Sequence, residues 1–483
     1  MTDQSASVRT YGGWRRSHSM GVGSLDTRQS VALVVAGALP VVLFAFRAYY
    51  LAGAALLAAL LALPLLLIRR HGVLLLDAVL GWARWSIAHR RGETAYRGGV
   101  LAELPTGWDL PGLLAPCTLL DAEVPGRGQR VGIVWNRATG TMAATLLLAP
   151  GGALLADRAT VDRHVAGWGE VLASLANDSA IRSAQVTIDL APDPGSQIAE
   201  HVAARIAPGA PALAREVVSE LAAAAPRLSS RVSTRMTLTL KPADRGRTRA
   251  ESIAEAAAEV VRALDALPIG TAGAEILRTA SATDVCAIVR RAFDPSASDA
   301  SAEDFNDLLW GESGPVAADE MPGHYEHDGV FSASFVLLEA PRQRVAHSVL
   351  LPLLSPGAYP RRVTLAYRTL SPEEAGDVLE REVAAGAVRA EYRRRTHRDA
   401  TARDRADAER AERAALEEAA GAGLLQFSVL VTVTAPSLEE LDDARAEVTK
   451  AAGRSRLKLR PARHAQAAVF AAGLPCGVYL PHA

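Results

Sequence analysis

The longest apolar runs of the chain lie near its start. Residues 31–46 and residues 48–68 contain no charged side chain, and Arg47 separates the two runs. A helix needs about 20 predominantly apolar residues to cross the hydrocarbon core of a bilayer. The pattern therefore predicts a two-helix transmembrane hairpin over residues 31–68, preceded by a tail of residues 1–30. Two buried helices of a soluble core are the alternative.

The charges around these runs predict their orientation. Arginines cluster before the first run and after the second, whereas the connection between the runs holds only Arg47. Because positively charged segments remain on the cytoplasmic side, we expect a multi-pass protein of the inner (cytoplasmic) membrane with both termini in the cytoplasm. The side chains expected at the membrane interface are Arg47, Tyr49, Tyr50, Arg69, Arg70, Trp82 and Trp85.

Residues 69–100 combine arginines with an apolar stretch at 73–89. Aliphatic and aromatic side chains beside basic ones are typical of a helix that lies in the headgroup region of a membrane. We therefore expect 69–100 to be a basic interfacial segment. A first core helix of the soluble part is the alternative for 73–89.

Beyond residue 100 the pattern changes to alternating strands and helices, which predicts a cytoplasmic α+β domain over 101–293. Residues 130–136 and 141–148 predict a β-hairpin with Gly140 in its turn, and residues 185–190 alternate as in a half-buried strand. Apolar residues at helical spacing predict a helix between them: Val161, Val165, Trp168, Leu172 and Leu175.

The stretch 294–328 contains ten acidic residues and no lysine or arginine. Rich also in Ser, Gly and Pro, it is interpreted as a linker between two domains. It includes His324 and His327, the nearest approach to a metal-binding pattern. Because the spacing of a zinc-binding helix and a third ligand are both lacking, we interpret the two histidines as part of a solvated loop.

A second α+β domain is predicted over 329–483, with a helical arm at 371–420 that begins at the sequence Ser371-Pro372-Glu373-Glu374. The arm balances arginines with acids, as a solvated or coiled-coil helix does. Its densest basic cluster is a candidate partner-binding site: Arg393, Arg394, Arg395 and Arg398. Neighbouring acids and the scarcity of aromatic residues argue against direct nucleic-acid binding there.

The last 60 residues give the clearest pattern. Phe427, Val429, Val431 and Val433 predict one face of a strand, and Ser437 with Glu440 predicts the capping box of a following helix. A strand near 457–459 and a helix at 465–472 come next. The order predicts a ferredoxin-like βαβ unit with a right-handed crossover, and the whole chain is assigned to the α+β class.

Charge divides the chain into two parts. The totals of 52 basic and 53 acidic residues nearly cancel, but residues 1–97 hold 11 arginines and 4 acids, a net charge of +7. The remaining 41 basic and 49 acidic residues give −8. The balance excludes a protein that coats DNA through a global basic excess, and predicts a basic membrane anchor with an acidic body.

The candidate chemistry argues against an enzyme. A phosphate-binding P-loop needs Gly-Lys-Ser/Thr, and none of Lys241, Lys450 and Lys458 lies in that context. No GxSxG motif occurs, and the glycines near Gly128 have the wrong spacing for a dinucleotide fingerprint. The three cysteines lack metal or redox spacing and are interpreted as free thiols in a reducing compartment. No catalytic residue, cofactor or metal site is predicted.

Two segments carry a resemblance to components of the type IV (conjugative) secretion apparatus of actinobacteria. Tyr11-Gly12-Gly13-Trp14-Arg15, residues 21–25 and the hairpin are similar to the small VirB-three or PrgI-like membrane subunit. Residues 425–477, including Leu474-Pro475-Cys476-Gly477, are similar to the end of the non-motor domain of a VirB-four-like ATPase.

The resemblance implies a membrane hairpin fused to the non-motor domain of the ATPase, in a non-catalytic assembly subunit that docks a separate motor ATPase. Its expected partners are that motor and other inner-membrane secretion subunits, in an oligomeric complex. The plan of two spans and a cytoplasmic body also resembles the EccE-type subunit of type VII secretion, which is the alternative.

Overall fold

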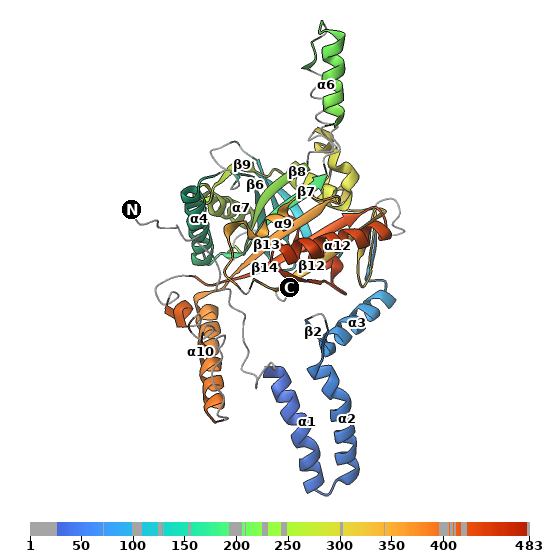
Figure 1. Cartoon of the computed structure of the whole chain (residues 1–483), viewed down its shortest axis with the longest axis vertical. Helices are drawn as coiled ribbons and strands as arrows, with labels where there is room; N and C mark the ends of the chain where they lie inside the picture. Colours follow the sequence, from blue (N-terminus) through green and yellow to red (C-terminus); the bar gives the residue numbers. More distant parts are fainter. Residues whose placement is uncertain are drawn as a thin grey trace, which may run out of the picture. The chain divides into compact units, whose positions relative to one another are not determined.

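The computed structural model describes residues 27–70, 72–98, 109–123, 128, 130–152, 156–192, 205–207, 209–224, 230–242, 249–299, 303–341, 343–395, 405, 409, 412–416 and 423–480 of the chain. It confirms the α+β class, because helices pack on a large antiparallel sheet (Figure 1). The described residues form two compact units. One contains the described residues of 91–369 and 425–480 with the sheet, and the other contains those of 27–90 and 370–424.

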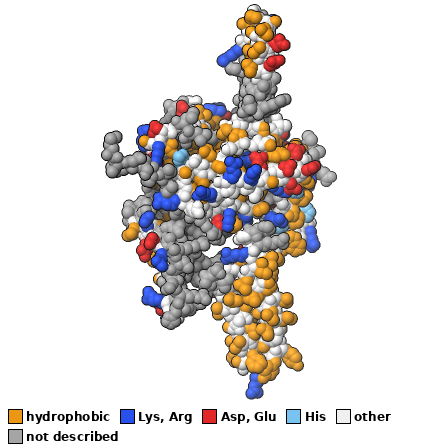
Figure 2. Space-filling view, in the orientation of Figure 1, with side chains coloured by type: hydrophobic (Ala, Val, Ile, Leu, Met, Phe, Trp, Pro, Cys, Tyr) orange, Lys and Arg blue, Asp and Glu red, His pale blue; other side chains and the backbone are white. Residues whose placement is uncertain are grey.

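The smaller unit contains the apolar helices. Among the described helices, α2 (Tyr49–Leu67) alone is long and apolar enough to cross a membrane, and the apolar part of α1 (Thr27–Ala45) is shorter. The two helices contact each other, and Nε2 of Gln29 donates a hydrogen bond to the Leu66 carbonyl at 2.5 Å. Figure 2 shows hydrophobic side chains over the surface of this pair. Only the second of the two predicted crossings therefore meets the length and composition criterion.

After α2, the strands β1 (Arg69–Arg70) and β2 (Val73–Leu74) pair with each other, and α3 (Leu75–Arg90) follows close to the helix predicted at 73–89. In the same unit, α10 (Pro372–Arg395) begins where predicted, because Oγ of Ser371 accepts a hydrogen bond from the Glu374 amide at 3.2 Å. The predicted arm is thus helical as far as Arg395. Most of its continuation to residue 420 lies outside the described residues.

The strands of the large sheet follow the order β3-β10-β11-β12-β14-β13-β7-β8-β6-β5-β4, with β15 paired to β12 and β9 paired to β6. Their bounds in chain order are β3 (Ala95–Arg97), β4 (Cys117–Glu123), β5 (Arg130–Asn136), β6 (Thr141–Pro150), β7 (Ile181–Pro192), β8 (Ser230–Leu240), β9 (Ala274–Thr279), β10 (Ala317–Glu320), β11 (Tyr325–His327), β12 (Val330–Glu339), β13 (Arg361–Thr369), β14 (Leu425–Ala435) and β15 (Lys458–Pro461). The hairpin predicted around Gly140 is confirmed as β5 and β6, with Asn136 opposite Thr141.

One arrangement of strands occurs twice in the sheet. β6 to β9 lie in the order β7-β8-β6-β9, with α4 (Arg158–Asn177) after β6 and α7 (Arg249–Asp265) after β8. β12 to β15 lie in the equivalent order β13-β14-β12-β15, with α9 (Leu351–Leu354) and α12 (Leu438–Arg454) in the corresponding connections. β7 pairs with β13, so the two repeats join edge to edge. The longer connection from β7 to β8 also contains α6 (Ala212–Ala224).

One face of the sheet is apolar and covered by helices. Met236, Leu238 and Leu240 of β8 pack with residues of α4 and α7, and all three side chains are buried. In the second repeat, the predicted alternation of β14 is confirmed, because Val431 is buried in a cluster with residues of α12. Figure 1 shows α12 lying along β12 and β14. The helix begins as predicted, since Oγ of Ser437 accepts a hydrogen bond from the Glu440 amide.

The opposite face is covered by α8 (Ala282–Phe293), α13 (Gln466–Ala472) and the segment after α13. Phe293 and Phe470 pack at 4.9 Å between ring centroids, and both are fully buried with Leu474 nearby. This second core explains why both faces of the sheet are protected from solvent.

The acidic stretch 294–328 differs from its prediction as a solvated linker. Within it, β10 pairs with β3 and β11 pairs with β12, so both belong to the large sheet. Strands from both sides of the stretch share that sheet, including the junction of β7 with β13. A prediction from local charge does not include such pairing with distant strands, which places β10 and β11 inside the folded body.

Candidate functional site

The sheet face beneath α8 and α13 carries buried hydroxyl groups at its centre. Oγ1 of Thr145 lies 2.9 Å from Oγ1 of Thr237, and Oγ1 of Thr187 lies 3.0 Å from Oγ1 of Thr364. Alternate residues of a strand point to the same face, so these pairs follow from threonines placed at every second position. A buried hydroxyl is stable only when it is hydrogen-bonded. This face therefore specifies the strand register together with the apolar face.

Three charged residues meet where the two repeats join. Asp189 of β7 lies opposite Arg362 of β13, whose Nε donates to Oδ1 of Asp189 at 2.8 Å. Oδ2 of Asp189 accepts a second bond from Nη1 of Arg235 on β8. Burial would raise the pKa of Asp189, but the charges of Arg235 and Arg362 outweigh it and hold the pKa below its usual value. One carboxylate thus serves two buried cations from both repeats.

The segment after α13 crosses the polar face and closes this cluster. Nη2 of Arg235 donates to the Gly473 carbonyl at 2.9 Å, and Nε2 of Gln185 donates to the Val478 carbonyl at 2.7 Å. Gly477 has a φ of 66°, and a Cβ there would lie 2.8 Å from the side chains of Ala143 and Thr239. Only glycine fits this close approach.

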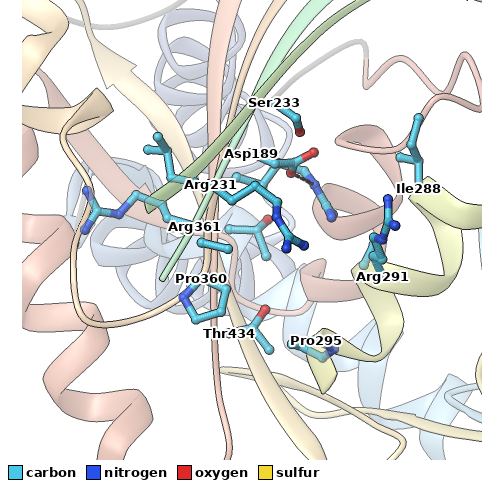
Figure 3. Close-up of a pocket in the computed structure, with 14 residues that line it drawn as sticks. Asp189, Arg231, Ser233, Ile288, Arg291, Pro295, Pro360, Arg361 and Thr434 are labelled. Carbon is cyan, nitrogen blue, oxygen red and sulfur yellow. Dashed lines mark hydrogen bonds and ion pairs between the residues drawn. The ribbon is translucent and has the colours of Figure 1, made fainter. Parts of the chain in front are cut away.

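A pocket of about 140 Å³ lies beside the charged cluster (Figure 3). Its floor is one end of β14, β13, β7 and β8, including Asp189, Arg231 and Thr434, and its opposite wall is α8 with Pro295. The pocket therefore sits at the junction of the two repeats, where strands with no local connection come together.

Two arginines from different walls face the same space in the pocket. Figure 3 shows the side chains of Arg231 from β8 and Arg291 from α8 on different sides of the pocket. Burial lowers the pKa of Arg291, and the positive charge of Arg231 lowers it further. The ring of Phe305 lies 4.8 Å from the guanidinium carbon of Arg291. Arg361 points away from this space, since its Nη1 donates to the Leu353 carbonyl at 3.1 Å.

A buried histidine connects to the pocket through hydroxyl groups. Nδ1 of His327 lies 2.6 Å from the Phe293 carbonyl oxygen, which can only accept, so Nδ1 carries the proton. Nε2 then accepts from Oγ of Ser332 at 2.8 Å, and Ser332 accepts from Oγ1 of Thr434 at 2.8 Å. Burial lowers the pKa of His327 to about 4, and the charge of Arg362 acts in the same direction. His327 is therefore neutral near pH 7.

This geometry corrects the prediction for His327, whereas His324 lies, half-buried, in the connection before β11. His327 is fully buried on a strand between the rings of Phe293 and Phe470, which differs from the solvated loop that the sequence predicts. Both of its ring nitrogens have hydrogen-bond partners within the protein. Among the described residues, no group of three or more His, Cys, Asp or Glu side chains could hold a metal ion.

The three cysteines are free and buried. Burial raises the pKa of Cys117 to about 12 and that of Cys286 to about 11. Burial and the neighbouring Cys117 also raise the pKa of Cys476 well above its usual value. Protonated thiols are poor nucleophiles and poor metal ligands, so these side chains act as small core residues.

The residues predicted at the membrane interface occupy the ends of the apolar helices and α3. Arg47 has a left-handed φ of 56° in the connection between α1 and α2, and Tyr49 and Tyr50 begin α2 with exposed side chains. At the other end, Arg69 and Arg70 form β1. Two aromatic residues lie on α3: Trp82 is exposed, and Trp85 stacks on His89 at 4.8 Å.

The candidate partner-binding arginines are only partly described. Arg393, Arg394 and Arg395 lie in the last turn of α10. Arg394 and Arg395 are exposed, and each forms an ion pair with Glu391. Arg398 lies outside the described residues. The structure therefore brings two of the four side chains together on one helix end, beside an acid that offsets part of their charge.

Sequence reasoning missed the cluster of Asp189, Arg235 and Arg362 and the two arginines of the pocket. One signal was present: Asp189 of β7 and Arg235 of β8 each belong to a run that otherwise alternates uncharged polar with apolar residues. A charge at such a position needs a partner on a neighbouring strand.

Comparison with known proteins does not add to this geometry. No protein-family model matches the chain, and no curated protein matches it significantly.

Proposed function

We propose that this protein is a membrane-anchored, non-catalytic assembly subunit of a type IV (conjugative) secretion system that docks a separate motor ATPase at the inner membrane. The observation that carries the membrane anchor is the surface of α2. Its 19 residues contain no charge, and large apolar side chains along it are exposed, including Leu51, Leu57 and Leu61. Apolar surface on this scale is stable when lipid covers it.

The finer membrane topology is part of the proposal. α1 packs beside α2 and would complete a two-helix transmembrane hairpin, with Arg47 at the turn and Arg69 and Arg70 at the opposite end. The greater number of arginines outside the turn supports cytoplasmic termini and a multi-pass protein. α3 would then lie in the headgroup region through Trp82 and its basic neighbours.

The docking role rests on the sequence resemblance and on the architecture of the body. The repeated order of strands β6 to β9 and β12 to β15 supports the predicted ferredoxin-like units. The chain contains no P-loop, so the energy for transport would come from a motor ATPase in the same oligomeric complex. The end of α10 at Arg394 and Arg395 is the candidate contact for that partner, with the other inner-membrane subunits as neighbours.

Membrane anchoring is tested by placing charge in the middle of α2. The double variant Leu56→Arg, Leu60→Arg should raise the free energy of membrane insertion of this helix by about 5 to 7 kcal/mol on biological insertion scales. We expect the full chain to move from the membrane pellet to the soluble fraction after alkaline extraction. Leu213→Arg, an exposed apolar position of α6, is the matched control and should leave the fraction unchanged. Retention of the double variant in the pellet would contradict the anchor.

The docking role is tested by purifying the tagged chain from its native membrane in mild detergent, followed by crosslinking and mass spectrometry. Recovery of a conjugative motor ATPase supports the proposal, and its absence removes the main support. The alternative, an EccE-like structural subunit of a type VII secretion system, keeps the two-span plan. It predicts type VII subunits among the captured proteins and genes for small WxG-type substrates nearby.

A further inference from the structure

The outer face of α12 carries its charges in two separate groups. Glu439 and Asp443 are exposed in the first half of the helix, and Lys450 and Arg454 are exposed in the second half. At 3.6 residues per turn, all four fall on the side of α12 opposite the buried Val448, which packs against the sheet. One surface of the protein is therefore acidic at one end and basic at the other.

These four charges are not offset within the part of the chain that the structure describes. None of them forms an ion pair there, whereas their neighbours do: Asp442 pairs with Arg445, and Glu447 pairs with Arg361. Within each group the like charges lie four residues apart, a spacing that disfavours the helix. The helix dipole favours acids in the first turn and bases in the last turn, but the inner charge of each group lies beyond those turns.

The spacing of the charges is self-complementary. Glu439 and Arg454 lie at equal distances from a midpoint beside Ala446, and Asp443 and Lys450 are symmetric about the same midpoint. If a second copy of α12 ran antiparallel along this face, each acid would lie opposite a base. A parallel copy would place like charges opposite each other. An interface with two-fold symmetry requires a patch of the first kind, which is complementary to itself.

Small side chains allow a neighbouring helix to approach this face closely. Ala446, Thr449 and Gly453 are exposed along the same side of α12. A Cβ added at Gly453 would meet no other atom within 4 Å, so the surface is open there. The distance between two packed helices depends on the side chains at their contact, and these residues permit a short one.

We propose that α12 is an interface between two copies of this chain, in which the helix packs antiparallel against the same helix of the second copy. Glu439 of each copy pairs with Arg454 of the other, and Asp443 pairs with Lys450, which gives four ion pairs. Exposed ion pairs are individually weak and are screened by salt, so the dimer is weak and dissociates as salt increases. The interface is independent of the membrane anchor and of the docking role proposed above.

Cysteine crosslinking of the full chain in its native membrane, in low salt, tests the arrangement. In the antiparallel pair, Ala446→Cys brings the two introduced thiols together at the midpoint. Leu438→Cys, the matched control at an exposed position that keeps all four charges, places its thiols about 25 Å apart along the helices at about 1.5 Å per residue. We expect a disulfide-linked dimer from Ala446→Cys alone, because the cysteines of the unchanged protein are buried. Its yield should fall several-fold as salt rises from about 0.05 M to about 0.5 M.

Charge reversal tests the pairing without an introduced cysteine. The variant Glu439→Arg, Asp443→Lys makes the whole face basic, and the variant Lys450→Glu, Arg454→Glu makes it acidic. Each should weaken self-association in dodecyl maltoside about ten-fold or more, as measured by sedimentation velocity, because like charges then oppose each other. A mixture of the two should associate at least as tightly as the unchanged protein. Lys241→Glu, at an exposed position outside α12, should leave the association unchanged.

Recovery of association in the mixture also shows that both charge-reversed variants are folded. The proposal is overturned if Ala446→Cys gives no dimer or crosslinks only to a different protein. Equal crosslinking of Leu438→Cys would indicate a parallel pair or random collision and would overturn it as well. So would a mixture of the charge-reversed variants that associates no better than either variant alone.

Discussion

The two faces of the central sheet solve the same packing problem with different chemistry. Against α4, α7 and α12, the strands present Val, Leu and Met in an apolar core, in which an apolar side chain of similar volume can replace another with a modest loss of stability. Against α8 and α13, the same strands present threonines, Asp189 and arginines, each of which requires a particular partner. The first face mainly supplies stability. The second specifies which strands pair, and it holds the pocket.

The largest difference between the faces is expected at Asp189. Asp189→Asn keeps the shape of the side chain but leaves Arg235 and Arg362 buried without their shared negative charge. We expect the free energy of unfolding to fall by about 3 to 5 kcal/mol. Denaturant unfolding in detergent, followed by tryptophan fluorescence, measures the change. Asp121→Asn, whose partner Arg130 is exposed, should cost less than about 1 kcal/mol, and equal effects would contradict the comparison.

The apolar face should respond to loss of volume. Leu238 is fully buried between the sheet and its helices, and Leu238→Ala should lower the free energy of unfolding by about 3 kcal/mol. Val232→Ala on the same strand removes methyl groups from a half-exposed side chain and should change the free energy of unfolding by about 0.5 kcal/mol or less. Similar effects at both positions would show that the cluster is not a close-packed core.

The pH dependence of stability should come from the polar face. His327 has a folded-state pKa of about 4, below its unfolded value, so the unfolded chain binds more protons between these values. Stability is therefore complete above about pH 6.5 and falls as pH decreases, by about 2 kcal/mol between pH 7 and pH 5. Unfolding at a series of pH values measures the slope. His327→Gln should remove this loss of stability at low pH, and His347→Gln, at an exposed site, should retain it. If His327→Gln still loses stability to the same extent as pH decreases, the pH dependence belongs to other groups.

The smallest effect is expected at the hydroxyl pairs. Thr145→Val leaves the hydroxyl of Thr237 buried without its partner, and should lower the free energy of unfolding by about 1 kcal/mol. The double variant Thr145→Val, Thr237→Val should cost less than the sum of the single changes, because both polar groups are gone. Thr139→Val breaks the hydrogen bond to Thr141 in an exposed turn and should have almost no effect. Additive losses in the double variant would exclude a coupled pair.

The features that local patterns encode were predicted well. The alternation of Val429, Val431 and Val433 and the cap at Ser437 depend on neighbours within a few residues, and both are confirmed. The burial of His327 depends instead on Phe293, 34 residues away, and on Phe470 of α13, which is far along the chain but packs on the neighbouring strand β12. The local charge predicts the wrong environment for His327, because the rings of Phe293, Tyr325 and Phe470 pack around its imidazole.

The pocket was beyond prediction for the same reason. Asp189 meets Arg235 across 46 residues and Arg362 across 173 residues. These contacts exist only in one register of β7 with β8 and β13, and a shift of one residue would turn each side chain to the opposite face. No pattern within a single strand contains that register.

The pairing of β7 with β13 also affects how the protein folds during its synthesis on the ribosome. β7 ends at Pro192 and β13 begins at Arg361. At a synthesis rate of about 5 to 20 residues per second, the edge of β7 that pairs with β13 therefore remains unpaired for roughly ten to thirty seconds. A strand with an unpaired side invites association with other nascent chains. Arg182 and Asp189 place charges of both signs on it during this interval, and such charges discourage aggregation. Asp189, which later joins the two repeats, would thus first help to protect the unpaired strand of the growing chain from aggregation.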